Sequence, residues 1–91
     1  MTIVIAILNW NGKTWLEKFL PSVIEYSQEA EIFVIDNAST DDSIVFLKDN
    51  FPEVNIIQNK VNSGFAAGYN EGLKLIRADI YCLLNSDVGR P

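Results

Sequence analysis

Polar side chains follow the apolar segments of this sequence, at the points where buried strands are expected to end. The clearest case is 80–84, five apolar residues that run directly into Asn85, Ser86 and Asp87. A continuous apolar run predicts a strand covered on both faces, as in a parallel sheet between helices. Ligands bind at the carboxyl ends of such strands, so Asp87 is a candidate for holding a metal ion or a phosphate-bearing substrate. The same triplet suits an ordinary turn, and alone it leaves both interpretations open.

Three other apolar segments also end at a polar residue. Asn9 follows the first, Asp36 ends the second and Asn59 follows the third. The segments expected to form these strands are 3–8, 31–36 and 54–58. Because the carboxyl ends of parallel strands share one edge of a doubly wound sheet, we expect these polar residues and Asp87 to gather around one crevice.

The segments between the strands carry helical patterns. In the first, Thr14 and Glu17 have the spacing of a capping box, and Pro21 predicts a kink or a break between Phe19 and Ser22. The regular alternation of strand and helix predicts a single α/β domain over residues 1–91, with a parallel sheet and right-handed crossovers.

The second helix is predicted to start at a cap formed by Ser39 and to run for about ten residues. Asp41 and Asp42 would lie in its first turn and Lys48 in its last turn. Both placements suit the helix dipole, because negative charge is favourable near the amino end and positive charge near the carboxyl end.

Glycines spaced four apart mark the third helix, which is predicted over 65–76. Gly64, Gly68 and Gly72 would lie on one side of it. A helix without side chains along one side can lie very close to another backbone or to a ligand.

Length and composition predict one small domain with a modest core. The chain has 91 residues, 48% of them hydrophobic, and a net charge of -5 that argues against binding nucleic acid. It has no histidine, and its one cysteine, Cys82, is expected to be a buried thiol in the last strand. The apolar segment 1–8 is too short for a signal peptide or a membrane span, so we expect a cytoplasmic protein, with membrane association of a longer protein left open.

Three familiar phosphate-binding folds do not fit the loops. The loop after the first strand lacks both G-x-G-x-x-G and G-x-x-x-x-G-K-[ST], which argues against a dinucleotide site and a triphosphate loop. A phosphoacceptor receiver domain would need acidic residues after the first strand and an aspartate after the third. The chain has Asn9 and Asn59 at those places.

Four motifs resemble one enzyme family. In chain order they are I-L-N-W-N-G, V-I-D-N-A-S-T-D-D-S, N-S-G-F-A-A-G-Y-N-E-G and L-L-N-S-D-V. Together they resemble the amino-terminal, nucleotide-binding half of family 2 glycosyltransferases with the GT-A fold, close to the rhamnosyltransferase-like branch. The resemblance covers essentially the whole chain and implies a Rossmann-like α/β fold with the strand order 3-2-1-4.

The resemblance implies a donor-binding role for seven residues. Asp36 would accept the ring N–H of uracil or thymine, although it could simply cap the following loop. Asn9 would line the base pocket, and Trp10 would stack on the base or serve in packing. The residues near the ribose and diphosphate would be Asn62, Gly64, Asn70 and Asn85, of which Asn62 and Gly64 could instead only start the third helix.

Asn85, Ser86 and Asp87 correspond to the D-x-D metal motif of the family, with Asn85 in place of the first aspartate. Asp87 is therefore the expected direct ligand of Mg²⁺ or Mn²⁺, with diphosphate oxygens and water completing the coordination. The cation would stabilise the leaving nucleoside diphosphate as a Lewis acid.

The implied reaction is an inverting, metal-assisted transfer of a sugar from a UDP- or dTDP-sugar to a saccharide or lipid-linked acceptor, as in polysaccharide biosynthesis at the cell envelope. The chain offers no catalytic base, so we expect the base and the acceptor half beyond Pro91 and no activity of these residues alone. An exposed edge at 80–84 would favour self-association. The alternative is a non-catalytic α/β interaction module.

Overall fold

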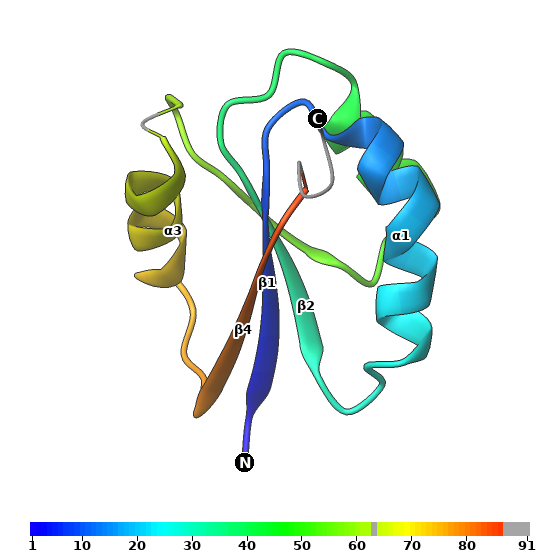
Figure 1. Ribbon diagram of the computed structural model, residues 1–91, viewed down its shortest axis with the longest axis vertical. Coiled ribbons are helices and arrows are strands. Elements are labelled where there is room, and N and C mark those ends of the chain that lie inside the picture. Colours follow the sequence, from blue (N-terminus) through cyan, green and yellow to red (C-terminus); the bar gives the residue numbers. More distant parts are fainter. Residues whose placement is uncertain (63, 87–91) are drawn as a thin grey trace.

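The computed structural model describes residues 1–62 and 64–86, and strands and helices alternate along them (Figure 1). The elements are β1 (Ile3–Asn9), α1 (Lys13–Glu25), β2 (Glu31–Asp36), α2 (Ser43–Asn50), β3 (Asn55–Gln58), α3 (Phe65–Leu73) and β4 (Ile80–Asn85). In this part of the chain, no helix is long and apolar enough to cross a membrane.

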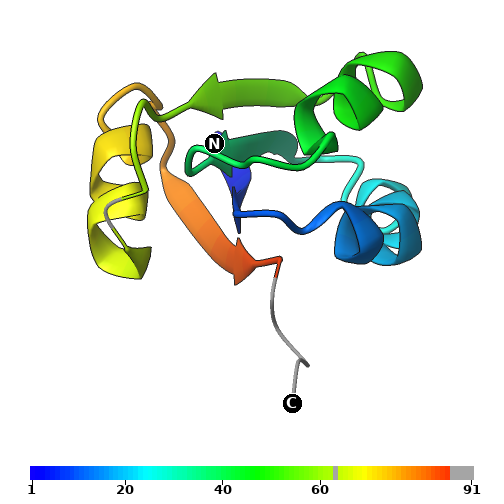
Figure 2. The same cartoon turned by 90° about the horizontal axis from the view of Figure 1, so that it is seen from above.

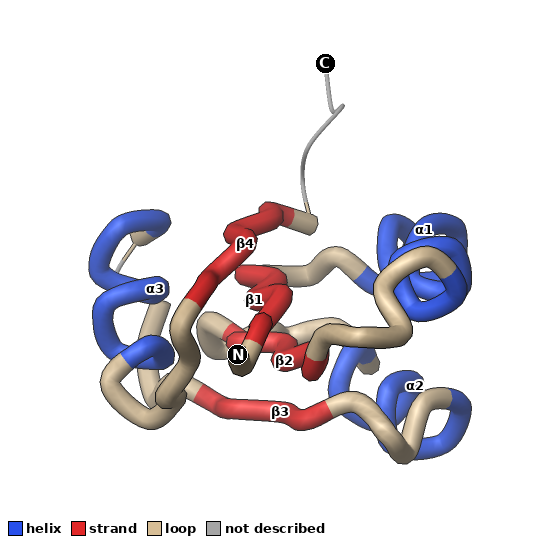
Figure 3. The backbone as a smooth tube through the Cα atoms, turned by 90° about the horizontal axis from the view of Figure 1, so that it is seen from below, coloured by secondary structure: helices blue, strands red, loops and turns tan. Residues whose placement is uncertain are grey.

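All four strands are parallel and lie in the order β3-β2-β1-β4, which confirms the predicted topology (Figure 3). The chain runs from β1 outward to β3 on one side and then returns to place β4 on the other side of β1. The strand order therefore reverses between β1 and β4. In open parallel sheets, the crevice at the carboxyl ends of two such strands is where ligands bind.

The helices cover both faces of the sheet, with α1 and α2 on one face and α3 on the other (Figure 2). Successive residues of a strand point to opposite faces, so β1 feeds two separate cores. The core beneath α1 and α2 contains Ile5, Ile7, Leu16, Leu20, Ile32, Val34, Leu47 and Val54. The core beneath α3 contains Val4, Ala6, Leu8, Ile35, Tyr69 and Ile76. The two-sided burial explains why β1 and β2 read as continuous apolar runs.

Helix α3 lies close to the sheet at two of its glycines, as predicted. A methyl group added at Gly72 would lie 2.5 Å from Cγ2 of Ile35, and one added at Gly68 would lie 3.0 Å from Cδ1 of Leu8. Gly64 serves a different purpose. It precedes α3 with φ of 89°, a backbone conformation that glycine adopts without strain.

The predicted capping box of α1 is wrong, and the break that Pro21 could have caused does not occur. The helix begins at Lys13 after Gly12, which has no side chain that could cap it, so Thr14 lies inside the first turn and forms no capping box with Glu17. The helix also continues through Pro21 without a break. A proline removes one backbone hydrogen bond, but the helix is held against the sheet by the buried Leu16 and Leu20 before Pro21 and by the partly buried Val23 and Ile24 after it.

The predicted start of α2 is also wrong, because a different residue caps it. Ser39 hydrogen-bonds to Asp36 instead, and α2 begins at Ser43, after both aspartates that were expected in its first turn. Asp41 Oδ1 accepts the backbone N–H of Ser43 at 3.0 Å, and its Oδ2 accepts that of Lys13 at 3.4 Å. One carboxylate therefore caps the amino ends of two helices, a contact between segments that sequence spacing does not reveal.

Helix α3 ends at Leu73 rather than at the predicted Ile76. The following residues tighten into turns in which Leu75 N–H donates to Gly72 O and Ile76 N–H to Leu73 O. Ile76 still reaches the core at 5% exposure. The predicted helix end is therefore wrong, because the hydrogen bonds after Leu73 span three residues instead of four.

Strand β4 is more exposed than predicted. Ile80, Tyr81 and Leu83 are 46%, 39% and 47% exposed, so the strand is not covered on both faces by the described residues. Cys82, predicted to be buried, is exposed. The physical reason is position in the sheet, since β4 is an edge strand that pairs only with β1 among the described residues.

Candidate functional site

The sheet brings the polar strand ends together at its carboxyl edge, where the loops after β1 and β2 lie side by side (Figure 1, top). Asn9 at the end of β1 is the register partner of Asp36 at the end of β2. On the other side of β1, Leu8 is the register partner of Asn85. Asn9 and Asp36 therefore lie level with each other on β1 and β2, whereas Asn85 on β4 lies level with Leu8, one residue before Asn9.

Asp36 is buried at this edge and held by three hydrogen bonds. Its Oδ1 accepts the side-chain amide of Asn9 at 2.9 Å and the hydroxyl of Ser39 at 2.6 Å. Its Oδ2 accepts the backbone N–H of Ser39 at 2.9 Å. The residue is 3% exposed, and no ion pair includes it in the described part of the chain. Neutral donors alone therefore compensate the burial of its charge.

Asn9 is fully buried beside Asp36, and its two hydrogen bonds fix which way its side-chain amide points. While its amide nitrogen donates to Asp36, its Oδ1 accepts the backbone N–H of Gly12 at 3.1 Å. A methyl group at Gly12 would clash with Asn9 Oδ1 and with the Ser86 side chain. The neighbouring Trp10, which directly follows β1, is 45% exposed.

Three asparagines join the ends of β2 and β3 to the start of α3. The Asn37 amide nitrogen donates to Asn62 Oδ1 at 2.9 Å, and the Asn59 amide nitrogen donates to Asn37 Oδ1 at 3.1 Å. Asn62 Oδ1 also accepts the backbone N–H of Gly64 at 2.9 Å. Asn62 and Gly64 thus help to set the entry into α3, while Asn70 is exposed on that helix.

The end of β4 contributes neutral oxygens within the described residues. Asn85 is half-buried, and Ser86 Oγ is buried and has no hydrogen-bond partner among residues 1–62 and 64–86. Asp87, the predicted metal ligand, lies outside the described residues. Among residues 1–62 and 64–86, no group of three histidine, cysteine or acidic side chains could hold a metal ion.

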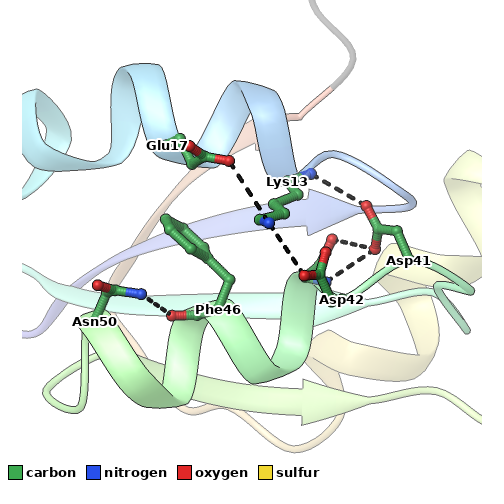
Figure 4. Close-up of polar contacts among 7 residues, drawn as sticks. Lys13, Glu17, Asp41, Asp42, Phe46 and Asn50 are labelled. Atoms are coloured by element: carbon green, nitrogen blue, oxygen red, sulfur yellow. Dashed lines mark hydrogen bonds and ion pairs between the residues drawn. The ribbon is translucent and has the colours of Figure 1, made fainter.

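Charged contacts lie beside this edge, between the amino ends of α1 and α2 (Figure 4). Lys13 Nζ donates to Asp42 Oδ2 at 3.1 Å, lies 4.0 Å from Glu17 Oε1 and sits over the ring of Phe46. The hydrogen bond with Lys13 lowers the pKa of Asp42, and the same bond raises the pKa of Lys13. These exposed groups tie two helices together.

Asn11, Ser39 and Asn37 belong to the hydrogen-bond network of the edge, and the sequence did not single out any of them as a site residue. Their positions carried a usable signal, because asparagine and serine favour turns in which a side chain bonds to nearby backbone. Residue type alone does not indicate which distant residue such a side chain will bond to. Asn11 has φ of 51° and bonds to the loop after β2, a contact between segments about 28 residues apart.

Comparison with known proteins identifies the family. The family model described as glycosyl transferase family 2 matches residues 2–88 of this chain. No curated protein matches it. The match confirms the resemblance that the four sequence motifs indicated. The rhamnosyltransferase-like branch stays a prediction.

Solved structures show the same fold. S. aureus TarS 1-349 in complex with UDP-GlcNAc has a TM-score of 0.81 and 22% identity, over 96% of this chain and 27% of that chain. The mannosyltransferase PcManGT from Pyrobaculum calidifontis, in complex with GDP-Man and Mn²⁺, has a TM-score of 0.78 and 19% identity, over 93% of this chain and 27% of that chain.

Glucosyl-3-phosphoglycerate synthase from Mycobacterium tuberculosis, in complex with Mn²⁺, UDP and glucosyl-3-phosphoglycerate, is similar over 93% of this chain and 33% of its own, with a TM-score of 0.78 and 19% identity. The chain thus spans between 27% and 33% of the lengths of these three proteins. By the family match over nearly its whole length and by its GT-A architecture, the chain belongs to glycosyl transferase family 2.

Proposed function

We propose that the carboxyl edge of the sheet binds a nucleoside-diphosphate sugar, with uracil or thymine as its base, for an inverting, metal-assisted sugar transfer. The observation that carries this proposal is the buried pair of Asn9 and Asp36, which lies at the ends of the two central strands and beside the point where the strand order reverses. A carboxylate placed there can accept the ring N–H that distinguishes uracil and thymine from cytosine.

The bonding of Asp36 leaves room for this role. A carboxylate offers about four acceptor positions, and Oδ2 accepts only the bond from Ser39 N–H among the described residues. The three existing bonds hold the carboxylate in one orientation, which reduces the entropy lost when a base binds. Trp10, exposed at the same edge, would stack on the base.

The diphosphate would lie toward β4 and the amino end of α3. Asn62 and Gly64 set the loop that enters α3, and Asn70 follows on its exposed side. We assign Asn85 to the same group because it stands beside Leu8 at the end of β4.

Asp87 would hold Mg²⁺ or Mn²⁺, with the substrate diphosphate supplying further oxygens. When bound, the cation neutralises the charge that develops on the leaving nucleoside diphosphate. A carboxylate and diphosphate oxygens suit such a hard cation, which takes oxygen ligands. The metal-binding part of the proposal rests on the place of Asp87 in the sequence motif.

The acceptor and the wider setting are further parts of the proposal. The acceptor would be a saccharide or a lipid-linked saccharide in polysaccharide biosynthesis at the cell envelope, with a longer protein working at a membrane surface. The two site carboxylates, Asp36 and Asp87, already have other roles, so we expect these 91 residues to bind the donor without transferring sugar. The proposal also includes self-association of the chain through the edge strand β4.

Thermal unfolding with nucleotide tests the donor site. UDP or dTDP with Mn²⁺ should raise the Tm of the chain, and Asp87→Ala or Asp36→Asn should each remove the shift. Asp49→Ala, an exposed change on α2, is the matched control and should keep it. Equal Tm values of the unchanged chain with and without nucleotide would contradict the proposal and favour a non-catalytic interaction module.

A further inference from the structure

Asn11 ties the loop after β1 to the loop after β2. Its Oδ1 accepts the backbone N–H groups of Thr40 at 2.7 Å and Asp41 at 3.1 Å. Its amide nitrogen donates to Thr40 Oγ1 at 3.1 Å, and its backbone N–H donates to Ser39 Oγ at 2.9 Å. One asparagine therefore bonds to three consecutive residues of the other loop. We call this set of contacts the Asn11 clasp.

The clasp reaches the buried carboxylate through Ser39. The Ser39 hydroxyl accepts the Asn11 backbone N–H while it donates to Asp36 Oδ1 at 2.6 Å, and the Ser39 backbone N–H donates to Asp36 Oδ2. Two of the three bonds that orient Asp36 therefore come from a residue that the clasp holds in place. Hydrogen bonds arranged in series in this way strengthen and orient one another.

Backbone conformation shows that the loop after β2 needs such support. Ala38 has φ of 63°, in the left-handed region, where an alanine costs roughly 1–2 kcal/mol. Its methyl group offers no local hydrogen bond in return. Asn11, at φ of 51°, tolerates the same region better because it is an asparagine. A strained residue persists only where its surroundings hold it, and in this loop the contacts of Asn11 and Asp36 do so.

We propose that Asn11 is a positioning residue that sets base specificity: it holds the loop whose Ser39 orients Asp36, so that the carboxylate accepts a ring N–H and rejects a ring that lacks one. This inference rests on the proposed donor site. Uracil carries a hydrogen on N3, whereas N3 of cytosine is an acceptor that a fixed carboxylate repels. Loosening the clasp should therefore weaken UDP binding more than CDP binding.

The variant Asn11→Gly isolates the side chain, because glycine adopts the same positive φ without strain. The matched control is Asn50→Gly at the last residue of α2, where the side-chain amide donates to Phe46 O, away from the site. Isothermal titration with UDP and with CDP, each with Mn²⁺, measures both affinities. Hydrogen exchange of the Thr40 and Asp41 amides reports on the clasp itself and needs no nucleotide.

We expect Asn11→Gly to speed exchange at Thr40 and Asp41 and to reduce the UDP-to-CDP affinity ratio by about three- to tenfold, the effect of one oriented hydrogen bond. Asn50→Gly should leave both unchanged. An equal fall in both affinities, or an unchanged exchange rate, would overturn the positioning role while leaving the donor site intact. If the unchanged chain binds UDP no better than CDP, or binds neither, the donor site fails and the inference with it.

Discussion

At the scale of single residues, Asp36 is the charge around which the polar edge is built. Every group that contacts its carboxylate is a donor: the Asn9 amide, the Ser39 hydroxyl and the Ser39 backbone N–H. Asn9 cannot reverse its amide without placing its nitrogen against the N–H of Gly12. The donors around Asp36 are thus fixed in direction, and they require two acceptor oxygens at this position.

Asp36→Asn tests that requirement, since the two side chains have nearly the same shape. In either orientation the new amide nitrogen faces a donor, Ser39 N–H on one side or Asn9 and Ser39 Oγ on the other. We expect a loss of about 1–3 kcal/mol in the free energy of unfolding, the cost of a buried polar group left unsatisfied. Urea unfolding of the unliganded protein measures it.

The control for this change is Asp49→Asn, which makes the same substitution at an exposed position of α2. It should alter the free energy of unfolding by less than about 0.5 kcal/mol. Equal effects of the two variants would show that the contacts of Asp36 do not stabilise the fold, and a stable Asp36→Asn protein would leave the carboxylate with a binding role alone.

At the scale of elements, the seating of α3 depends on a glycine. Ile35 is fully buried, and three of its side-chain atoms would lie between 2.5 and 2.8 Å from a methyl group at Gly72. These atoms cannot withdraw, because the core beneath α3 surrounds them. The helix must therefore move away from the sheet if residue 72 is enlarged.

Gly72→Ala should destabilise the protein although alanine is the better helix former. The clash is expected to cost about 1–3 kcal/mol, whereas the gain in helix propensity is about 1 kcal/mol. Thermal unfolding should therefore show a lower Tm. Lys74→Ala, a change at the exposed residue directly after α3, should leave the Tm nearly unchanged. A higher Tm for Gly72→Ala would mean that α3 can shift without loss of packing.

The ion pair between α1 and α2 predicts how stability depends on pH. The Lys13 hydrogen bond lowers the pKa of Asp42 below its ordinary 3.8, and the pKa of Lys13 rises above 10.5. The lowered pKa of Asp42 stabilises the folded protein at pH values above the pKa that this carboxyl has in the unfolded chain. The stabilisation is lost as the pH falls through the pKa of Asp42 in the folded protein. The raised pKa of Lys13 stabilises the folded protein at pH values below the pKa that this lysine has in the unfolded chain. That stabilisation is lost as the pH rises through the pKa of Lys13 in the folded protein.

Asp42→Asn should therefore lower the Tm near pH 7, and the difference from the unchanged protein should shrink below about pH 4 and above about pH 10.5. Because both groups are exposed, the difference is small and should also shrink in high salt. Thermal unfolding of the two proteins across pH, at low salt, measures it. A difference that stays constant with pH would show that the ion pair does not link the helices.

At the scale of the whole molecule, the sequence predicted the strands and their order but not the contacts between loops. Each strand is an apolar run with a polar end, a pattern contained in one short segment, and the family motifs supplied the order. The first helix start was mispredicted because its cap, Asp41, comes from another segment of the chain. The exposure of Cys82 was missed for a similar reason, since burial of a strand depends on its neighbours in the sheet.

In the candidate site, too, contacts between strand ends could be predicted from the sequence, whereas contacts between loops could not. Asn9 and Asp36 could be paired from the sequence because the ends of adjacent parallel strands meet. Asn11 and Ser39 could not be placed, because their contacts join two loops whose shapes depend on Ala38 and Asn11 having positive φ. Asp87 remains a sequence prediction that lies outside the described residues.

The edge at β4 determines how the molecule should behave at high concentration. Its outer backbone groups have no strand partner among the described residues, and Ile80 and Leu83 are nearly half exposed. No charged residue lies between Ile80 and Asn85. Such an edge is a template for pairing with a second copy, which the net charge of -5 opposes.

We therefore expect the chain to self-associate between micromolar and millimolar concentration, and more strongly in high salt because salt screens the repulsion. Leu83→Lys should shift the association to higher concentration, since a lysine on an edge strand opposes pairing. Val45→Lys, at an exposed valine of α2, adds the same charge away from the edge and is the control. Sedimentation equilibrium under reducing conditions, which exclude a disulfide through Cys82, measures the effect. A monomer at every concentration, or equal effects of the two lysines, would contradict pairing through β4.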